Sequence, residues 1–321
     1  MNLEMKAAAK AGAKNGEFQL TVSKSAIAFV RCWLPEGAPR AVIQIVHGMA
    51  EHSGRYDRLA AALTAEGYAV YAQDLPGHGR TARAPDELGH FSETGGWRLA
   101  LQSLRCLQRE LGEWHEGVPQ FMLGHSMGSF LLQDYLSRHA HDLAGAVLSA
   151  STADAGPLRA VGLALLKAEG LWRGLDTRSA LAEALTFKSY NRKFAPTRTA
   201  FDWLSRDPHE VDRYVSDPQC GFRCTTGLWV QLLEAMGRLD KRRAARVPKR
   251  LALLAIAGED DPVCAGRKGP ASLKKRYSEA GLSDVSARSY VKGRHELLND
   301  VCRDEVTADL IGWLNQRAPV A

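Results

Sequence analysis

Long apolar segments are missing from this 321-residue chain. No run approaches the about 18 apolar residues that a transmembrane helix needs, so we expect none. Residues 1–14 carry several charges and lack the apolar stretch of a secretory signal. We therefore interpret 1–14 as a flexible N-terminus and expect the protein to be cytoplasmic.

Several metal- and nucleotide-binding patterns are also absent. The chain has no H-E-x-x-H motif, P-loop or Rossmann glycine fingerprint. It has six cysteines, and without a secretory signal we expect reduced thiols rather than disulfides. Cys220 and Cys224 have no second cysteine pair or histidine at zinc spacing. We predict neither a metal nor a cofactor.

Charge of one sign does not dominate, since the net charge is +6. The basic residues concentrate in the segment 238–250, where Asp240 is the lone acid. No aromatic interleaving or known motif supports nucleic-acid binding, which we reject. The segment is interpreted as a solvated linker or helix face, and a docking strip for anionic lipid headgroups remains the alternative.

Apolar, β-branched runs alternate with helix-like segments through the first half of the chain. We predict a hairpin and then buried strands, at 18–22 and 26–33, followed by 41–46, 68–72, 121–124 and 145–149. Helices are predicted between them at 57–66, opening on a capping Asp57, and at 97–111 and 127–139. This alternation favours an α/β fold, a mostly parallel, doubly wound sheet covered on both faces.

The strand rhythm stops after Ser151 and resumes at 251–257, with a weaker strand at 285–291 and a final helix at 300–316. We therefore predict a core of residues 15–151 and 247–321, interrupted by a helical lid, residues 152–246. The aromatic residues of this insertion are expected to form mostly its own core. Residues 163–172 fit either lid core, which we favour, or an amphipathic helix that touches membranes.

The pentapeptide Gly124-His125-Ser126-Met127-Gly128 stands between a predicted strand and a predicted helix. G-x-S-x-G in this setting is typical of the nucleophile elbow of a serine hydrolase. The turn is so tight that side chains at both glycine positions would collide with their neighbours. Its backbone presents the Ser126 hydroxyl above the sheet. His125 is expected to point to the opposite side of the elbow.

Ester hydrolysis also needs a base, an acid that orients the base, and donors for the oxyanion. In an elbow hydrolase the acid and then the histidine follow the serine. Asp260 and Asp261 follow the strand 251–257, and His295 follows the last strand. Upstream, the strand 41–46 runs into His47-Gly48-Met49-Ala50. We expect the N–H of Met49 in this segment and the N–H of Met127, which follows Ser126, to be the oxyanion donors.

These motifs resemble one known family. The chain is similar to the serine aminopeptidase / hydrolase-4 branch of the α/β-hydrolases, which includes monoacylglycerol lipases and bacterial lysophospholipases. The resemblance rests on five blocks: His47-Gly48-Met49-Ala50-Glu51-His52-Ser53-Gly54-Arg55-Tyr56, Asp74-Leu75-Pro76-Gly77-His78-Gly79, the pentapeptide, Asp261-Pro262-Val263 and Arg294-His295-Glu296. It implies the α/β-hydrolase fold and spans nearly the whole core.

The resemblance implies Ser126 as nucleophile, His295 as general base and Asp261, which directly precedes Pro-Val, as acid. The expected activity is cleavage of carboxylic esters through an acyl-enzyme. The expected partner is a small ester or lipid such as a monoacylglycerol or lysophospholipid, and transient membrane contact remains open. An aminopeptidase or amidase is the first alternative, with Glu169 and Glu183 as candidates for an acidic pocket. A binding protein without turnover is the second.

Overall fold

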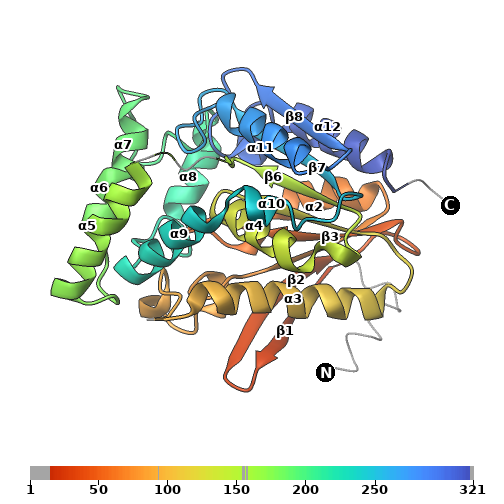
Figure 1. Ribbon diagram of the computed structural model, residues 1–321, viewed down its shortest axis with the longest axis horizontal. Coiled ribbons are helices and arrows are strands. Elements are labelled where there is room, and N and C mark those ends of the chain that lie inside the picture. The colour runs from red at the N-terminus through yellow and green to blue at the C-terminus, as the bar shows by residue number, and fades with distance from the viewer. Residues whose placement is uncertain (1–14, 93, 154–155, 157, 319–321) are drawn as a thin grey trace.

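The computed structural model describes residues 15–92, 94–153, 156 and 158–318. The segment 1–14, predicted to be flexible, lies outside them. An eight-stranded sheet organises the chain in the order β1-β2-β4-β3-β5-β6-β7-β8 (Figure 1). Its strands are β1 (Asn15–Ser23), β2 (Ala26–Trp33), β3 (Ala41–Val46), β4 (Tyr68–Gln73), β5 (Gln120–His125), β6 (Gly145–Ser149), β7 (Ala252–Gly258) and β8 (Val285–Tyr290).

The sheet is mostly parallel. The hairpin β1–β2 and the pair β2–β4 are antiparallel, and every other neighbouring pair is parallel. The strands β3 to β7 are buried along their whole length, which explains why they read as unbroken apolar runs. The predicted strands are confirmed. Their ends differ by at most one residue, except that β1 begins three residues earlier than predicted.

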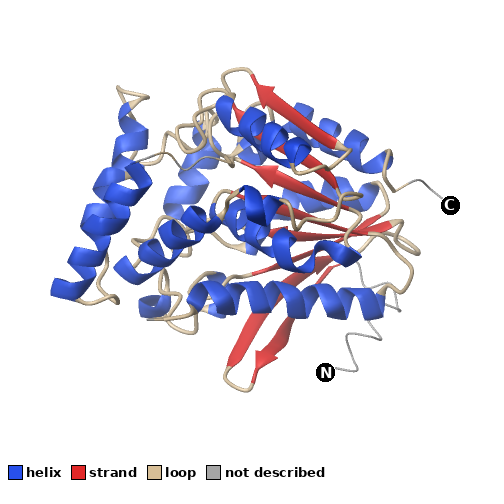
Figure 2. Ribbon diagram, viewed as in Figure 1, coloured by secondary structure: helices blue, strands red, loops and turns tan. Residues whose placement is uncertain are grey.

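Helices cover both faces of the sheet (Figure 2). Trp97, Phe130 and Tyr277, from α3, α4 and α11, share one apolar core. Leu63 and Leu310, from α2 and α12, belong to the core on the other face. The doubly wound α/β fold is therefore confirmed. The helices are α2 (Asp57–Ala65), α3 (Gly96–Trp114), α4 (Met127–His139), α11 (Lys268–Glu279) and α12 (Arg303–Asn315), with 3₁₀ turns η1 (Ser53–Tyr56), η2 (Gly79–Thr81), η3 (Pro85–Glu87), η4 (Ala140–Asp142) and η5 (Leu297–Asn299).

Two predicted helix starts need correction. Asp57 is the first residue of α2 rather than its cap, because the turn η1 runs directly into the helix and leaves Tyr56 at the capping position. The last helix begins at Arg303 and not at Asp300, whose carboxylate instead accepts hydrogen bonds from Arg206 and from the Arg294 N–H. In both cases a local turn competes with the helix for the same residues.

The segment between β6 and β7 is helical in its described part, where the β-pairing is confined to the bridge Arg178–Thr225. We call residues 152–246 the insertion. The helices α5, α6 and α7 gather on the side towards which the arrowheads of β6 and β8 point (Figure 1). The division into a core and a lid stays a prediction. The helices are α5 (Leu158–Arg173), α6 (Ala180–Leu185), α7 (Phe187–Arg192), α8 (Pro208–Ser216), α9 (Thr226–Arg238) and α10 (Lys241–Ala244).

The basic segment 238–250 is mostly exposed, yet part of it binds the α/β body. Arg243 pairs with the buried carboxylate of Asp134 on α4, and Lys241 lies 3.0 Å from Glu279 on α11. These contacts attach the end of the insertion to two core helices. Within the described residues, no helix combines the length and apolar character that a membrane crossing requires.

Candidate active site

Ser126 lies in the sharp turn between β5 and α4. Its backbone is left-handed, with φ of +51°, and its N–H donates to the Ser149 carbonyl oxygen at 3.0 Å. A non-glycine residue with this φ is strained, and such strain clusters at functional sites. The strand–turn–helix setting predicted around the pentapeptide is the one observed.

The two glycines of the pentapeptide are sterically required. A Cβ on Gly124 would lie 2.7 Å from the Gly128 carbonyl oxygen, and one on Gly128 would lie 2.3 Å from that of Val46. Backbone atoms stand at both positions and cannot move aside as a flexible side chain can. The elbow therefore packs against its own helix and against the end of β3.

The structure brings Ser126, His295 and Asp261 into one hydrogen-bonded chain. The Ser126 hydroxyl lies 2.9 Å from His295 Nε2, and His295 Nδ1 lies 3.0 Å from Asp261 Oδ1. Asp261 follows β7 and His295 follows β8, so all three come from the carboxyl ends of strands in one parallel array. With Nδ1–H donating to the carboxylate, Nε2 is free to accept the hydroxyl proton.

Neighbouring Asp260 takes no part in this chain. Its side chain is 45% exposed and lies 3.7 Å from Lys193, whereas Asp261 is buried. The turn after β7 directs the two carboxylates in different directions, so the structure pairs Asp261 with His295.

Burial and charge act against each other in the His295–Asp261 pair. Burial alone would raise the pKa of Asp261, but the charge and hydrogen bond of His295 and donors from Cys264 and Val263 hold it below its usual value. Burial would lower the pKa of His295, but Asp261 and more distant carboxylates raise it overall. The pair thus favours an ionised carboxylate beside a basic imidazole.

Cys264 contacts the same carboxylate. Its Sγ lies 3.1 Å from Asp261 Oδ2, while the Val263 N–H donates to Oδ1 at 2.8 Å. The sequence places Cys264 close to Asp261 but does not predict this hydrogen bond, which depends on the turn after β7. Together the two donors orient the carboxylate towards His295.

Two rings flank the imidazole of His295. The ring centroids of His125 and of Trp203, which comes from the insertion, each lie 4.9 Å from that of His295. The expectation that His125 points away from the nucleophile is therefore wrong, because its ring packs beside the imidazole. Burial and the nearby His295 hold the pKa of His125 well below its usual value.

Met49 and Met127 both lie at the cavity beside Ser126. Within the described residues, neither backbone N–H donates to a protein acceptor. Met127 is the first residue of α4, where an N–H has no partner inside the helix. Free N–H groups beside a nucleophile can bind an anion, which is the chemistry expected of these two positions.

A buried ion-pair cluster supports the loop that carries Met49. The Glu51 carboxylate accepts from the Gly48 N–H and the Tyr56 hydroxyl, and it lies 3.5 Å from Arg55. Arg55 also donates to Glu296, the residue after His295. Burial and the charge of Glu296 raise the pKa of Glu51 to about 7, although Arg55 opposes this.

Arg55 contacts both Glu51, in its own loop, and Glu296, in the neighbouring loop after β8. The role of Glu296 is not predicted, because no local pattern links it to a residue 241 positions away. Arg55 thus joins the loop after β3 to the loop after β8.

A cavity of about 470 Å³ opens beside Ser126. Its walls come from the elbow, the loops after β3 and β7 and the insertion, and they are mainly aliphatic and aromatic. Phe187, Tyr190, Trp203 and Trp229 line it, so these aromatics serve the cavity as well as the core of the insertion. Among the described lining residues, Arg159 alone carries a formal charge.

Glu169 and Glu183 do not line this cavity. Glu169 accepts from the Thr226 hydroxyl at 3.1 Å and lies 3.5 Å from Arg173, and Glu183 pairs with Arg223. Both carboxylates are already engaged by partners within the insertion.

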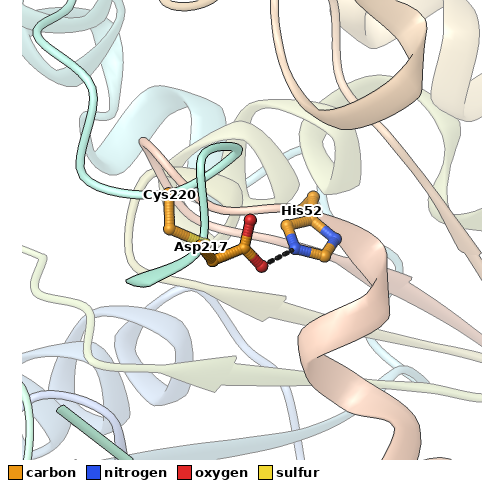
Figure 3. Close-up of side chains that lie close together, drawn as sticks. All are labelled: His52, Asp217 and Cys220. Atoms are coloured by element: carbon orange, nitrogen blue, oxygen red, sulfur yellow. Dashed lines mark hydrogen bonds and ion pairs between the residues drawn. The ribbon is translucent and has the colours of Figure 1, made fainter. Parts of the chain in front are cut away.

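One cluster could be taken for a metal site. His52, Asp217 and Cys220 bring potential ligand atoms within 4.8 Å of one another, and Figure 3 shows the His52 ring facing Asp217. However, the Gly54 N–H donates to His52 Nδ1 at 3.1 Å, so Nε2 carries the proton and donates to Asp217 at 2.9 Å. That proton occupies the position a metal would need, so hydrogen bonding accounts for the cluster.

The sheet order, the elbow and the strand-end residues define this protein as an α/β-hydrolase. Residues 37–301 match the family model described as serine aminopeptidase, S33. The chain belongs to that family.

Similarity to proteins named as lipases extends over most of the chain. It is 29% identical to the monoglyceride lipase of Homo sapiens over 300 residues, covering 91% of this chain and 88% of that protein. It is 29% identical to the monoacylglycerol lipase of Mycolicibacterium smegmatis over 287 residues, covering 88% and 90%. The structure of a thermostable carboxyl esterase from Bacillus coagulans in complex with glycerol is 26% identical, with a TM-score of 0.85 and coverage of 95% and 99%.

Proposed function

We propose that this protein hydrolyses lipid carboxylic esters with Ser126 as its nucleophile. The observation that carries the proposal is the chain Ser126–His295–Asp261, which ends in a mainly apolar cavity of about 470 Å³. Relatives named monoglyceride lipase, similar over most of the chain, support a monoacylglycerol as the substrate, and a relative named probable lysophospholipase L2, similar over 115 residues, supports a lysophospholipid.

The geometry suggests the order of events. His295 Nε2 takes the Ser126 proton as the hydroxyl oxygen attacks the ester carbonyl, and Asp261 stabilises the resulting imidazolium. The N–H groups of Met49 and Met127 bind the oxyanion. His295 then protonates the leaving alcohol, and a water activated by the same nitrogen releases the acid from the acyl-enzyme. These groups supply every role in the cycle, so we propose no cofactor.

The cavity favours an ester over the aminopeptidase alternative. A free amino terminus calls for an acidic partner, and the described lining residues include no carboxylate. The charge that is present, on Arg159, would repel an ammonium group. A binding protein without turnover remains the other alternative, and it predicts a Ser126 that is inert towards a fluorophosphonate.

We also propose that the insertion acts as a lid and contacts lipid surfaces. Leu158, Val161 and Leu165 on α5 line the cavity and are themselves exposed, so the cavity has an apolar rim. Exposed apolar patches of this kind mark sites of association. A cytoplasmic location is part of the proposal and is supported by the six cysteines, which are all free thiols.

Hydrolysis assays with and without the proposed nucleophile test this function. We expect turnover of monoacylglycerols and lysophospholipids, with acyl chains of graded length, and almost none by Ser126→Ala. Ser129→Ala, which alters a nearby serine that donates to the Ser126 carbonyl oxygen, is the matched control. Preference for aminoacyl amides, or no ester turnover together with no fluorophosphonate labelling of Ser126, would reject the proposal.

A further inference from the structure

Arg159 is the one charged residue among the described residues that line the cavity. It lies in the first turn of α5, between Leu158 and Val161 of the apolar rim. The same cavity contains Ser126, so a molecule bound for hydrolysis shares this space with the guanidinium.

The guanidinium has few partners of its own. Its Nη1 donates to the Leu233 carbonyl oxygen on α9 at 3.0 Å, and no carboxylate of the described residues pairs with it. The nearby acid on α9, Glu234, lies 2.7 Å from Lys167 instead. Among the described residues, the side chain of Arg159 has this one carbonyl acceptor, so most of the five guanidinium N–H donors are left for a ligand.

A glycine on α9 leaves space for the Arg159 guanidinium. A Cβ on Gly237 of α9 would lie 2.6 Å from Arg159 Nη1 and 2.7 Å from Cζ. The bare α-carbon of Gly237 therefore lets the guanidinium lie directly against the helix. The charge therefore lies beside α9 at the cavity wall.

We propose that Arg159 binds an anionic group of the substrate and makes the enzyme prefer acyl esters that carry a phosphate or carboxylate. Arg159 is half-buried, and a carboxylate or phosphate in the cavity would give its remaining N–H groups acceptors of opposite charge. The planar guanidinium fork matches carboxylate and phosphate oxygens. This inference rests on the proposed ester hydrolysis and narrows its substrate class.

The anion could belong to the headgroup or to the far end of the acyl chain, and three substrates distinguish these sources. Monooctanoylglycerol is neutral, octanoylglycerol phosphate carries a headgroup anion, and the glycerol monoester of octanedioic acid carries an acyl-chain carboxylate. All three are assayed as monomers without vesicles, so that attraction of the enzyme to a charged surface does not contribute.

We expect the wild type to hydrolyse one of the anionic esters with the higher kcat/KM. Arg159→Gln should lower that value about tenfold to a hundredfold, as expected for a lost charge-assisted bond, and leave the neutral ester unchanged. Arg159→Lys should retain part of the preference. Lys167→Gln is the matched control, because it removes a cation of α5 that also bridges to α9 but does not line the cavity.

Three results would overturn the inference. The wild type could show no preference for either anion, the preference could survive in Arg159→Gln, or that variant could lose activity equally on all three esters. The last result would mean that Arg159 only holds α5 against α9. In each case turnover of the neutral ester leaves the proposed function standing, whereas absence of all turnover rejects both.

Discussion

At the scale of single residues, Asp260 and Asp261 show how one peptide bond separates two environments. Asp261 is buried against His295, whereas Asp260 faces solvent beside Lys193. We expect Asp261→Asn to lower kcat for ester hydrolysis by about 10⁴-fold, because the imidazole loses its orienting partner. Asp260→Asn is the matched control and should keep nearly full activity. A comparable loss in both variants would refute the assignment.

The pH dependence of kcat/KM is a second test of the Asp261→Asn variant. His295 must be neutral to accept a proton, and its folded pKa is raised above its usual value. Wild-type kcat/KM should therefore fall as pH drops through a pKa above about 6.5. Removing the Asp261 charge should move that midpoint to lower pH in Asp261→Asn. The contribution of the ion pair to folding stability depends on pH in the opposite direction to kcat/KM. It is present at low pH and is lost as pH rises through the folded pKa of His295.

The sequence predicts residues whose roles are encoded in local patterns. Ser126 lies in a characteristic turn, and Asp261 and His295 each follow a recognisable strand, so the meeting of these three side chains could be predicted. Trp203 and Glu296 could not, because their contacts join loops that are distant in the chain. The position of the His125 ring depends on side-chain packing that no spacing rule describes.

At the scale of elements, Arg55 connects two loops that carry different parts of the site. We expect Arg55→Met to lower kcat more than it changes KM, because Glu51 then no longer fixes the turn that presents the Met49 N–H. Loss of one oxyanion donor is typically worth about 10²–10³-fold in kcat, which is the upper limit here. Steady-state kinetics and the rate of fluorophosphonate labelling measure the effect.

Arg55→Lys should recover part of that activity, because it keeps the charge between Glu51 and Glu296. The control is Arg58→Met, since Arg58 also joins the core to a glutamate, Glu210 of α8, but away from the loop of Met49. If Arg55→Met lowers only the melting temperature and leaves kcat intact, the cluster stabilises the fold without positioning the site.

The strands and core helices could be predicted because elements that are buried against a sheet have apolar residues at regular spacing. The insertion was predictable only as helical. Its helices pack around a cavity rather than against a sheet, so their apolar faces are shared between core, cavity and solvent. Trp172 illustrates this, because the sequence favours core packing for residues 163–172, whereas Trp172 is 86% exposed.

At the scale of the whole molecule, one face of α5 combines the cavity rim with further exposed apolar residues. Leu158, Leu165 and Trp172 recur every seven residues and therefore lie on one stripe of the helix. Leu171 beside them is 92% exposed. This stripe extends the rim outwards from the mouth of the cavity.

We expect the double variant Leu171→Ser/Trp172→Ser to bind phospholipid vesicles about tenfold or more weakly, because each apolar side chain contributes about 1.5–3 kcal/mol on burial. Vesicle co-sedimentation measures this, and hydrolysis of monomeric octanoyl esters should not change. The control is Val291→Ser, which removes an exposed apolar side chain after β8. Equal vesicle binding by the double variant and the wild type would refute membrane contact through α5.

The contacts of Trp203 limit how the insertion can move. The Trp203 ring packs on His295, and the carbonyl oxygens of Trp203 and Leu204 accept from the His295 and Glu296 N–H groups at 3.4 and 2.8 Å. A swing of the whole insertion about its two ends would break these bonds and remove the wall beside the base. If the insertion acts as the proposed lid, we therefore expect substrate to enter by a local displacement of α5 and α6, while residues 203–204 stay in place beside His295.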